Sequence, residues 1–446
     1  MALLIMSSAL STALAVTSLF LSAGAATSSA YSLVADYSDN TFFDGFETFT
    51  GADPTHGHVN YTDMAFAASN GLLGFNQYPS TNETRAFIKV DSTNKAPNGR
   101  NAVRLTSLST FSVGMLAVMD IHHQPVGPGL WPAAWFLGTG ATWPAAGEID
   151  VVEHVNNNSF NAMTLHTSSG CSVANNTNGF VGALQAEDCN SGNDGTMGCG
   201  IQAPGQIKAY NQQVSTAGEA FNAQGGALYV TEWTTTGINI WSFARSAVPS
   251  SLNAVNPSTA GFPTPLASFS GSGCDFSKAF VNMVMIINTA FCGDWAGQVW
   301  ESSGMAAQTG VATCNDFVAN NPQAFTEAYW EFGSIKIYSS GAQPGKNPSK
   351  RSVTEQPSVS FSTTIVGSEN ADKAAVNATS AALHFANATS TFVPELRKGG
   401  RIVSVAGFAG AGSLRGAASS DAPSTESKVA AYVAVFAAVL VFAALL

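Results

Sequence analysis

Short segments in which apolar and polar residues alternate recur from about Tyr31 to Tyr338, and clusters of Gly, Asn, Ser and Pro separate them. Such segments include residues 102–106, 114–122, 227–233, 238–243 and 281–288. Alternation with a period of two is typical of strands that bury one face, and no long run of helical period competes with it. We therefore predict an all-β fold, in which two antiparallel sheets pack as a β-sandwich and a concave sheet forms a cleft.

The N-terminal end of the chain departs from this pattern. It is apolar as far as Leu21, and the small residues Ala23–Ala25 follow shortly afterwards. This arrangement predicts a signal peptide over residues 1–26, although the usual positive charge is missing. An N-terminal membrane anchor is the alternative. Residues 27–340 then remain for the folded domain.

The C-terminal end changes character twice. Residues 341–428 are rich in Ser, Thr, Ala and Gly, which predicts a disordered stalk. Residues 429–446 are continuously apolar, and no Lys or Arg follows them as it would after a stop-transfer helix. With small residues at 416–420 and a polar spacer, they match a GPI-attachment signal. We predict a GPI anchor on an exported chain, and a retained transmembrane helix is the alternative.

The most distinctive chemistry of the chain lies at residues 147–153, where Glu148, Asp150 and Glu153 interrupt an apolar strand. Strict alternation places Glu148 and Asp150 on one face and Glu153 on the other. A one-residue bulge at Val151–Val152 would return Glu153 to the face of the other two, and bulges are common beside active sites. The alternative is an acidic edge strand whose carboxylates face water.

Two carboxylates on one concave face suit a retaining glycosidase, in which the carboxyl groups lie about 5–5.5 Å apart. One carboxylate attacks the sugar, and the other carboxyl protonates the leaving oxygen. Tryptophans flank the motif at Trp131, Trp135 and Trp143, and the segment around His166 follows it. Because Trp rings commonly stack on sugars, the cluster favours a sugar-binding cleft over ordinary core packing.

These segments resemble the fungal endo-1,3(4)-β-glucanases, of the laminarinase type, in glycoside hydrolase family 16. The likeness covers about residues 31–340 and rests on the following runs: 131–135, 143–144, 147–153, 155–156, 165–171, 225–226, 232–233, 291–297 and 328–331. It implies a concanavalin A-like jelly roll.

The resemblance also implies roles for individual residues. Glu148 would be the nucleophile, Glu153 the acid/base and Asp150 an assisting carboxylate. Trp135, Trp143 and His166 match positions that line the donor side of the cleft, and Trp131 is a further candidate for substrate binding.

Two departures from the family pattern stand out. The family usually has Cys just before the Trp-Pro-Ala run, where this chain has Gly127–Gly129, so one disulfide of the family is expected to be missing. The residue after the acid/base is commonly Gly, and here it is His154. We expect His154 to be a surface residue that points away from the cleft.

The cysteines and sequons agree with export. An even number of cysteines in a secreted chain suggests up to three disulfides, with the pairing left open, and zinc binding lacks a Cys-x-x-Cys or paired His motif. These cysteines are Cys171, Cys189, Cys199, Cys274, Cys292 and Cys314. Glycosylation is predicted at Asn60, Asn82, Asn175, Asn377 and Asn387. We expect the sequon at Asn157 to stay unmodified, because a glycan there could crowd the cleft.

The net charge of −11 with 11% charged residues argues against nucleic-acid binding and fits a secreted enzyme that acts on a neutral polysaccharide. We therefore expect a monomeric endo-β-glucanase at the cell surface or wall, without cofactor or bound metal. A transglycosylase, in which a sugar hydroxyl intercepts the same intermediate, is the alternative enzyme. A non-catalytic glucan-binding protein on the same fold would be expected to lose a catalytic Glu, and both are present.

Overall fold

The computed structural model describes residues 30–176, 179–192, 197–209, 212–341, 345–346, 359–366, 396–398 and 401–403. The chain divides into two units, 1–380 and 381–446, and of the second unit the structure describes a hairpin of β24 (Leu396–Lys398) and β25 (Arg401–Val403). The predicted signal peptide, the predicted GPI-attachment signal and the sequons at Asn377 and Asn387 lie outside the described residues. No helix within the described ranges is long and apolar enough to cross a membrane.

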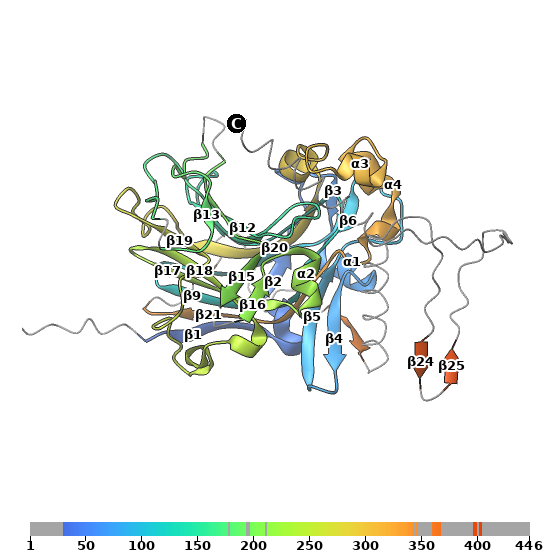
Figure 1. Ribbon diagram of the computed structural model, residues 1–446, viewed down its shortest axis with the longest axis horizontal. Coiled ribbons are helices and arrows are strands. Elements are labelled where there is room, and N and C mark those ends of the chain that lie inside the picture. The colour runs from blue at the N-terminus through green and yellow to red at the C-terminus, as the bar shows by residue number, and fades with distance from the viewer. Residues whose placement is uncertain are drawn as a thin grey trace, which may run out of the picture. The chain divides into compact units, whose positions relative to one another are not determined.

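Two large sheets stack face to face in the first unit, which confirms the predicted antiparallel sandwich. In Figure 1, β12 and β20 lie in the upper layer, and β9, β21 and β1 lie in the lower layer. One sheet has nine strands in the order β19-β18-β17-β9-β21-β5-β4-β23, with β1 also paired to β21, and the other has eight in the order β13-β14-β12-β11-β10-β20-β7-β2.

The strands of the nine-stranded sheet are β1 (Ser32–Ser38), β4 (Leu73–Tyr78), β5 (Glu83–Lys89), β9 (Met115–His123), β17 (Ala227–Thr234), β18 (Gly237–Phe243), β19 (Ala267–Ser270), β21 (Tyr329–Ser339) and β23 (Ser362–Ile365). Those of the eight-stranded sheet are β2 (Phe46–Thr48), β7 (Arg104–Ser107), β10 (Leu130–Gly138), β11 (Glu148–Glu153), β12 (Ala162–His166), β13 (Ala183–Leu184), β14 (Cys199–Gln202) and β20 (Met283–Phe291).

Smaller elements connect these strands. Three further pairs are β3 (Val59–Tyr61) with β6 (Arg100–Ala102), β8 (Ser109–Thr110) with β22 (Gly345–Lys346), and β15 (Gln206–Ala209) with β16 (Gln212–Ser215). The helices are short: α1 (Met64–Ser69), α2 (Gly218–Ala223), α3 (Met305–Thr309) and α4 (Cys314–Asn320), with the 3-10 helices η1 (Asp39–Gly45), η2 (Arg245–Ala247), η3 (Ser250–Asn253) and η5 (Pro322–Phe325) and the π-helix η4 (Gly293–Gly297).

The alternation of residues along β10 explains how this sheet carries both core and cleft. Ala134 and Phe136 are buried in the core between the sheets. Trp131, Ala133 and Trp135 lie on the opposite face and line a cavity. Because successive side chains of a strand point to opposite faces, one apolar strand serves both surfaces.

All six cysteines of the chain pair, which confirms the expectation of three disulfides and supplies the pairing that the sequence left open. Cys171 is bonded to Cys274, Cys189 to Cys199 and Cys292 to Cys314. The third bond joins Cys292, directly after strand β20, to Cys314 at the start of α4, so it ties together the two ends of the segment 292–314.

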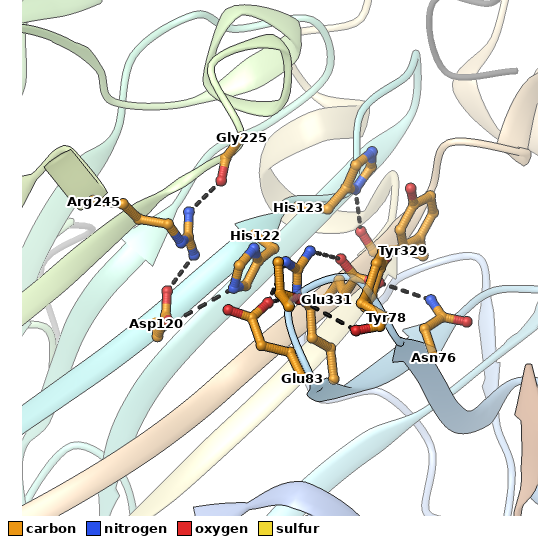
Figure 2. A network of polar contacts seen from close by, with 12 residues as sticks. Asn76, Tyr78, Glu83, Asp120, His122, His123, Gly225, Arg245, Tyr329 and Glu331 are labelled. Carbon is orange, nitrogen blue, oxygen red and sulfur yellow. Dashed lines mark hydrogen bonds and ion pairs between the residues drawn. The ribbon is translucent and has the colours of Figure 1, made fainter. Parts of the chain in front are cut away.

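A network of charged and polar side chains covers the outer face of the nine-stranded sheet (Figure 2). Glu331 accepts hydrogen bonds from Asn76 Nδ2 at 2.7 Å, Tyr78 OH at 2.6 Å and Arg85 Nη1 at 3.3 Å. Asp120 pairs with Arg245, and with His122 at 3.6 Å. The carboxylates of this network all have hydrogen-bond or ion-pair partners, so we interpret it as stabilising this face of the sheet.

The predicted stalk does not begin cleanly at residue 341. Strand β23 (362–365) pairs in parallel with β4, and the Phe361 ring packs on Phe43 and Phe75 with centroid separations of 4.7 and 5.7 Å. For these residues the prediction of a disordered stalk is wrong. The Phe361 ring supplies the apolar group that this stretch buries, whereas the side chains of β23 itself are exposed.

Candidate active site

Strand β11 presents its three carboxylates to a cavity of about 350 Å³ over the eight-stranded sheet. Glu148, Asp150 and Glu153 all line this cavity, whereas Ile149 and Val151 lie in the core. The prediction that the three acidic side chains share one face is therefore confirmed.

The predicted β-bulge explains this arrangement. Opposite β10, Ala134 pairs with Val152 and Trp135 with Asp150, so Val151 has no partner. Opposite β12, the register steps from Asp150–Thr164 to Glu153–Ala162. The extra residue restores Glu153 to the side of Asp150, as expected for a bulge.

Each of the two glutamates accepts a hydrogen bond from an indole N–H. Trp131 Nε1 donates to Glu153 Oε1 at 2.7 Å, and Trp143 Nε1 donates to Glu148 Oε2 at 2.9 Å. An N–H that donates to a carboxylate favours its ionised form and fixes its orientation. The structure thus brings two of the three predicted tryptophans into contact with the predicted catalytic pair.

His166 lies beside the first two carboxylates. Its Nε2 is 3.1 Å from Asp150 Oδ2 and 3.8 Å from Glu148 Oε1, and its Nδ1 contacts Ser191 Oγ at 2.8 Å. The contact with Ser191 fixes the ring, so that Nε2 faces the acidic pair. Ligand atoms of Glu148, Asp150 and His166 lie within 4.8 Å of one another, a spacing that could also hold a metal ion.

Burial raises the pKa of all three carboxyl groups, and the Asp150 charge adds to the increase at both glutamates. The surroundings of the glutamates nevertheless differ. His166 lies within ion-pair distance of Glu148. Among the described residues no basic side chain lies that close to Glu153. The pKa of each glutamate is raised to about 8, so the assignment of Glu148 as nucleophile and Glu153 as acid/base rests on the family resemblance and not on a difference between these pKa values.

The floor of the cavity contains polar residues that no motif in the sequence indicated. Trp135 Nε1 donates to Asn288 Oδ1 at 2.7 Å, and Asn288 Nδ2 donates to Tyr61 OH at 3.1 Å. The Arg104 guanidinium lies 5.1 Å from the Trp135 ring centroid. Asn288 could have been found from the sequence, because it is the polar residue that ends the apolar run 283–287.

A second wall of the cavity comes from a loop far away in the sequence. Asp53 and Asp294 both line the cavity. The Asp294 N–H donates to Thr55 O at 3.0 Å, and His56 Nδ1 lies 2.8 Å from Asp294 Oδ2. That hydrogen bond raises the pKa of the exposed His56. No sequence motif indicated that these segments would meet.

His154 is completely buried, so the prediction that it lies on the surface is wrong. Once the bulge returns Glu153 to the cavity, alternation turns the next side chain toward the interior. Neither ring nitrogen of His154 has a hydrogen-bond partner within the described ranges. Burial lowers the pKa of His154 to about 4.

The described sequons are accessible. Asn60, Asn82, Asn175 and Asn157 are all exposed. Asn157 Nδ2 donates to Gln308 Oε1 at 3.4 Å. Glycosylation at Asn60, Asn82 and Asn175 stays a prediction, as does the expectation that Asn157 is unmodified.

This domain is similar in sequence to known glycoside hydrolases. Residues 46–338 match the family model described as the XgeA-like catalytic GH16 domain. The chain is 39% identical over 324 residues to a probable endo-1,3(4)-β-glucanase of Aspergillus clavatus, a match that covers 71% of this chain and 48% of that protein. The chain thus spans about half the length of this relative.

Two solved structures are similar to this domain. One is the GH16 laminarinase 16A of Phanerochaete chrysosporium with β-glucans in its donor and acceptor sites, at 36% identity and a TM-score of 0.61. The match covers 69% of this chain and 99% of that one. The other is an elongating GH family 16 β-1,3-glucosyltransferase, at 37% identity and a TM-score of 0.61, with coverage of 69% and 100%.

Proposed function

The chain belongs to glycoside hydrolase family 16, and from this we propose that it is a retaining endo-β-glucanase that hydrolyses β-1,3 and mixed β-1,3/1,4 glucans. The observation that carries the proposal is the placement of Glu148 and Glu153 on one strand, side by side in one cavity, each bonded to an indole. The similar laminarinase binds β-glucans, which supports this choice of substrate.

In the first step, a carboxylate oxygen of Glu148 attacks the anomeric carbon. The bond from that carbon to the leaving oxygen breaks, and Glu153 gives its proton to this oxygen. In the second step, water attacks the same carbon, Glu153 takes a proton from the water, and the ester bond to Glu148 breaks. Two inversions leave the anomeric configuration unchanged.

Asp150 and His166 assist this chemistry. A negative charge on Asp150 disfavours a second negative charge beside it and so raises the pKa of each glutamate, which helps Glu153 keep its proton. His166 contacts Asp150 and Glu148, so it partly offsets this repulsion on the side of the nucleophile. The two glutamates can then hold different protonation states at one pH.

Amide variants test the assignment. Glu148→Gln and Glu153→Gln in the full chain should each lower turnover of laminarin and mixed-linkage glucan by at least about 100-fold, because loss of acid–base catalysis alone costs about 10²–10⁴-fold. The exposed Glu219→Gln is the matched control and should keep the parent rate. A rate close to that of the parent in either cavity variant would refute the proposed pair.

Transglycosylation is the second candidate, and the likeness to an elongating β-1,3-glucosyltransferase favours it. An acceptor sugar hydroxyl would then replace water in the second step. Asp53 and Asp294 line the same cavity as Glu153, so they are polar groups that an acceptor sugar bound there could contact. Products longer than the starting oligosaccharides would identify a transferase, and exclusively shorter ones a hydrolase.

Location at the cell surface or wall is part of the same proposal. Three disulfides favour an oxidising compartment, and the apolar residues 429–446 favour a GPI anchor. Treatment of cells with phosphatidylinositol-specific phospholipase C should release the protein into the medium. Protein that stays in the membrane fraction after treatment would instead favour a retained transmembrane helix.

A further inference from the structure

We propose that Asn161 is a positioning residue that holds the backbone of Glu153 across the β-bulge, so that Glu153 can reach the leaving oxygen. This inference rests on the proposed function, because it assumes that Glu153 is the acid/base. Asn161 lies outside the cavity and touches no substrate in this proposal; it acts through the backbone of strand β11.

The bulge creates the need for such a residue. Between Asp150 and Glu153, two residues of β11 face one residue of β12, so the regular ladder of hydrogen bonds is interrupted there. An interrupted ladder leaves backbone N–H and C=O groups without strand partners. Buried backbone groups of this kind are costly unless another group bonds them.

The Asn161 side chain supplies both missing partners. Its Oδ1 accepts the Glu153 N–H at 2.7 Å, and its Nδ2 donates to Val151 O at 2.8 Å. The side-chain amide of Asn161 therefore spans the bulge from Val151 to Glu153. Asn161 is completely buried, so water cannot take over these bonds.

Asn161 is itself fixed by a chain of buried groups. Its N–H donates to Thr216 Oγ1 at 3.3 Å, and its carbonyl accepts the Ala203 N–H at 2.8 Å. Thr216 Oγ1 donates to Pro204 O at 2.8 Å, and Tyr229 OH donates to Thr216 O at 2.5 Å. Because Tyr229 belongs to β17, these bonds link the Asn161 residue to the nine-stranded sheet and hold its side-chain amide in place.

This arrangement acts on the reaction step that needs a proton. A misplacement of about 1 Å can cost about 100-fold in rate, since proton transfer requires hydrogen-bond reach. Glu148 lies before the bulge, where its strand pairing is regular. Loss of the amide should therefore impair the acid Glu153 and spare the nucleophile Glu148.

Substrates with different leaving groups separate these two effects. Polymeric glucan needs protonation of its leaving oxygen, whereas a 2,4-dinitrophenyl β-oligoglucoside has a leaving group that departs unprotonated. For Asn161→Ala in the full chain, we expect kcat/KM for laminarin to fall about 100-fold. We expect kcat/KM for the aryl glycoside to change less than about 3-fold, and azide, which needs no base, to speed up turnover of the aryl glycoside.

Asn222 offers a matched control, because its side-chain amide also bonds backbone N–H and C=O groups, but far from the bulge. Asn222 Oδ1 accepts the Gln124 N–H at 2.8 Å, and its Nδ2 donates to Gln124 O at 2.9 Å, at the end of β9 in the opposite sheet. Asn222→Ala loses these two hydrogen bonds and the contact of its Nδ2 with His123 Nε2 at 3.0 Å, so its stability should fall at least as much as that of Asn161→Ala. Its kcat/KM for laminarin should stay within about 3-fold of the parent.

A second pair of variants keeps the test decisive if Asn161→Ala does not fold. Thr216→Val removes the hydroxyl that accepts the Asn161 N–H while it conserves shape, and Thr216→Ser keeps the hydroxyl. The Val variant should lose about 10-fold in kcat/KM for laminarin with little change for the aryl glycoside, and the Ser variant should recover the parent value.

Glu153→Ala, measured in parallel, distinguishes failure of the positioning role of Asn161 from failure of the proposed function. If Glu153→Ala itself keeps the parent rate on laminarin, the proposed function fails. If Glu153→Ala shows the selective loss while the Asn161 or Thr216 variants lose both substrates equally, or lose neither, the positioning role is overturned and the proposed function stands.

Discussion

The indole N–H groups that contact the two glutamates should set the two limbs of the pH profile separately. Trp131 donates to Glu153 and Trp143 to Glu148. Each hydrogen bond stabilises a carboxylate, so its removal favours the protonated carboxyl and raises the pKa of that glutamate. The substitutions Trp131→Phe and Trp143→Phe remove the N–H and keep an aromatic ring.

The expected shifts differ in size because the two indoles differ in exposure. A hydrogen bond to a charged group contributes about 1.5–3 kcal/mol, and one pKa unit corresponds to about 1.4 kcal/mol. Loss of the Trp131 N–H should therefore raise the pKa of Glu153 by about 1–2 units. Trp143 is 50% exposed, so water can replace its N–H, and the shift at Glu148 should be at most about 1 unit.

The expected shifts also move opposite limbs of the profile. The acid/base must be protonated for the first step, so a higher pKa of Glu153 in Trp131→Phe moves the alkaline limb of kcat/KM to higher pH. The nucleophile must be ionised, so a higher pKa of Glu148 in Trp143→Phe moves the acidic limb to higher pH. One variant broadens the profile and the other narrows it.

The assay is kcat/KM for laminarin as a function of pH in the parent and both variants, because this ratio reports the ionisations of the free enzyme. Weaker substrate binding by either variant lowers the whole curve without moving its limbs. An acidic-limb shift in Trp131→Phe, or an alkaline-limb shift in Trp143→Phe, would refute the assigned roles. Unchanged limbs in both variants would refute the stated effect of the indoles.

Two further predictions concern stability. The pKa of His154 is about 4 in the folded protein and about 6.5 in the unfolded chain. As the pH falls, the unfolded chain therefore binds the proton first. The free energy of unfolding should drop by up to about 3 kcal/mol between pH 6.5 and 4. His154→Leu should lose less stability than the parent between pH 7 and 4.5 by urea denaturation, and an equal loss would contradict this. A chain that ends at residue 340 should unfold at a lower urea concentration than one that ends at 366. It lacks the half-buried Phe361 ring, whose burial contributes about 1–2 kcal/mol to the free energy of unfolding. Equal urea midpoints would show that β23 adds no stability.

Much of the fold could be predicted because alternation is local. The residues of β10 and β11 indicate by themselves which face meets the core, and three carboxylates can share one cleft only if the strand contains a bulge. The outer strand β23 was missed because its Ser and Thr residues match the composition of the surrounding low-complexity stretch, although Phe361 and Ile365 were visible in it.

The remaining parts of the site depend on contacts between distant segments. Asn288 lies some 140 residues from Glu148, and Asp53 almost a hundred residues before it. The pairing of the six cysteines is equally non-local, since fifteen arrangements are compatible with six residues. No local pattern could reveal that Asn161, eight residues after Glu153, bonds its backbone.

The error at His154 shows how far the bulge reaches. The same extra residue that carries Glu153 into the cavity also inverts the facing of the next position, so that His154 enters the core instead of solvent. A small residue would fit there without any polar group to satisfy, whereas His154 brings two ring nitrogens that have no hydrogen-bond partner among the described residues. The bulge therefore couples the placement of the acid/base to the composition of the core. A change at residue 154 should affect stability at low pH through the histidine charge, and affect catalysis through the backbone that Asn161 holds.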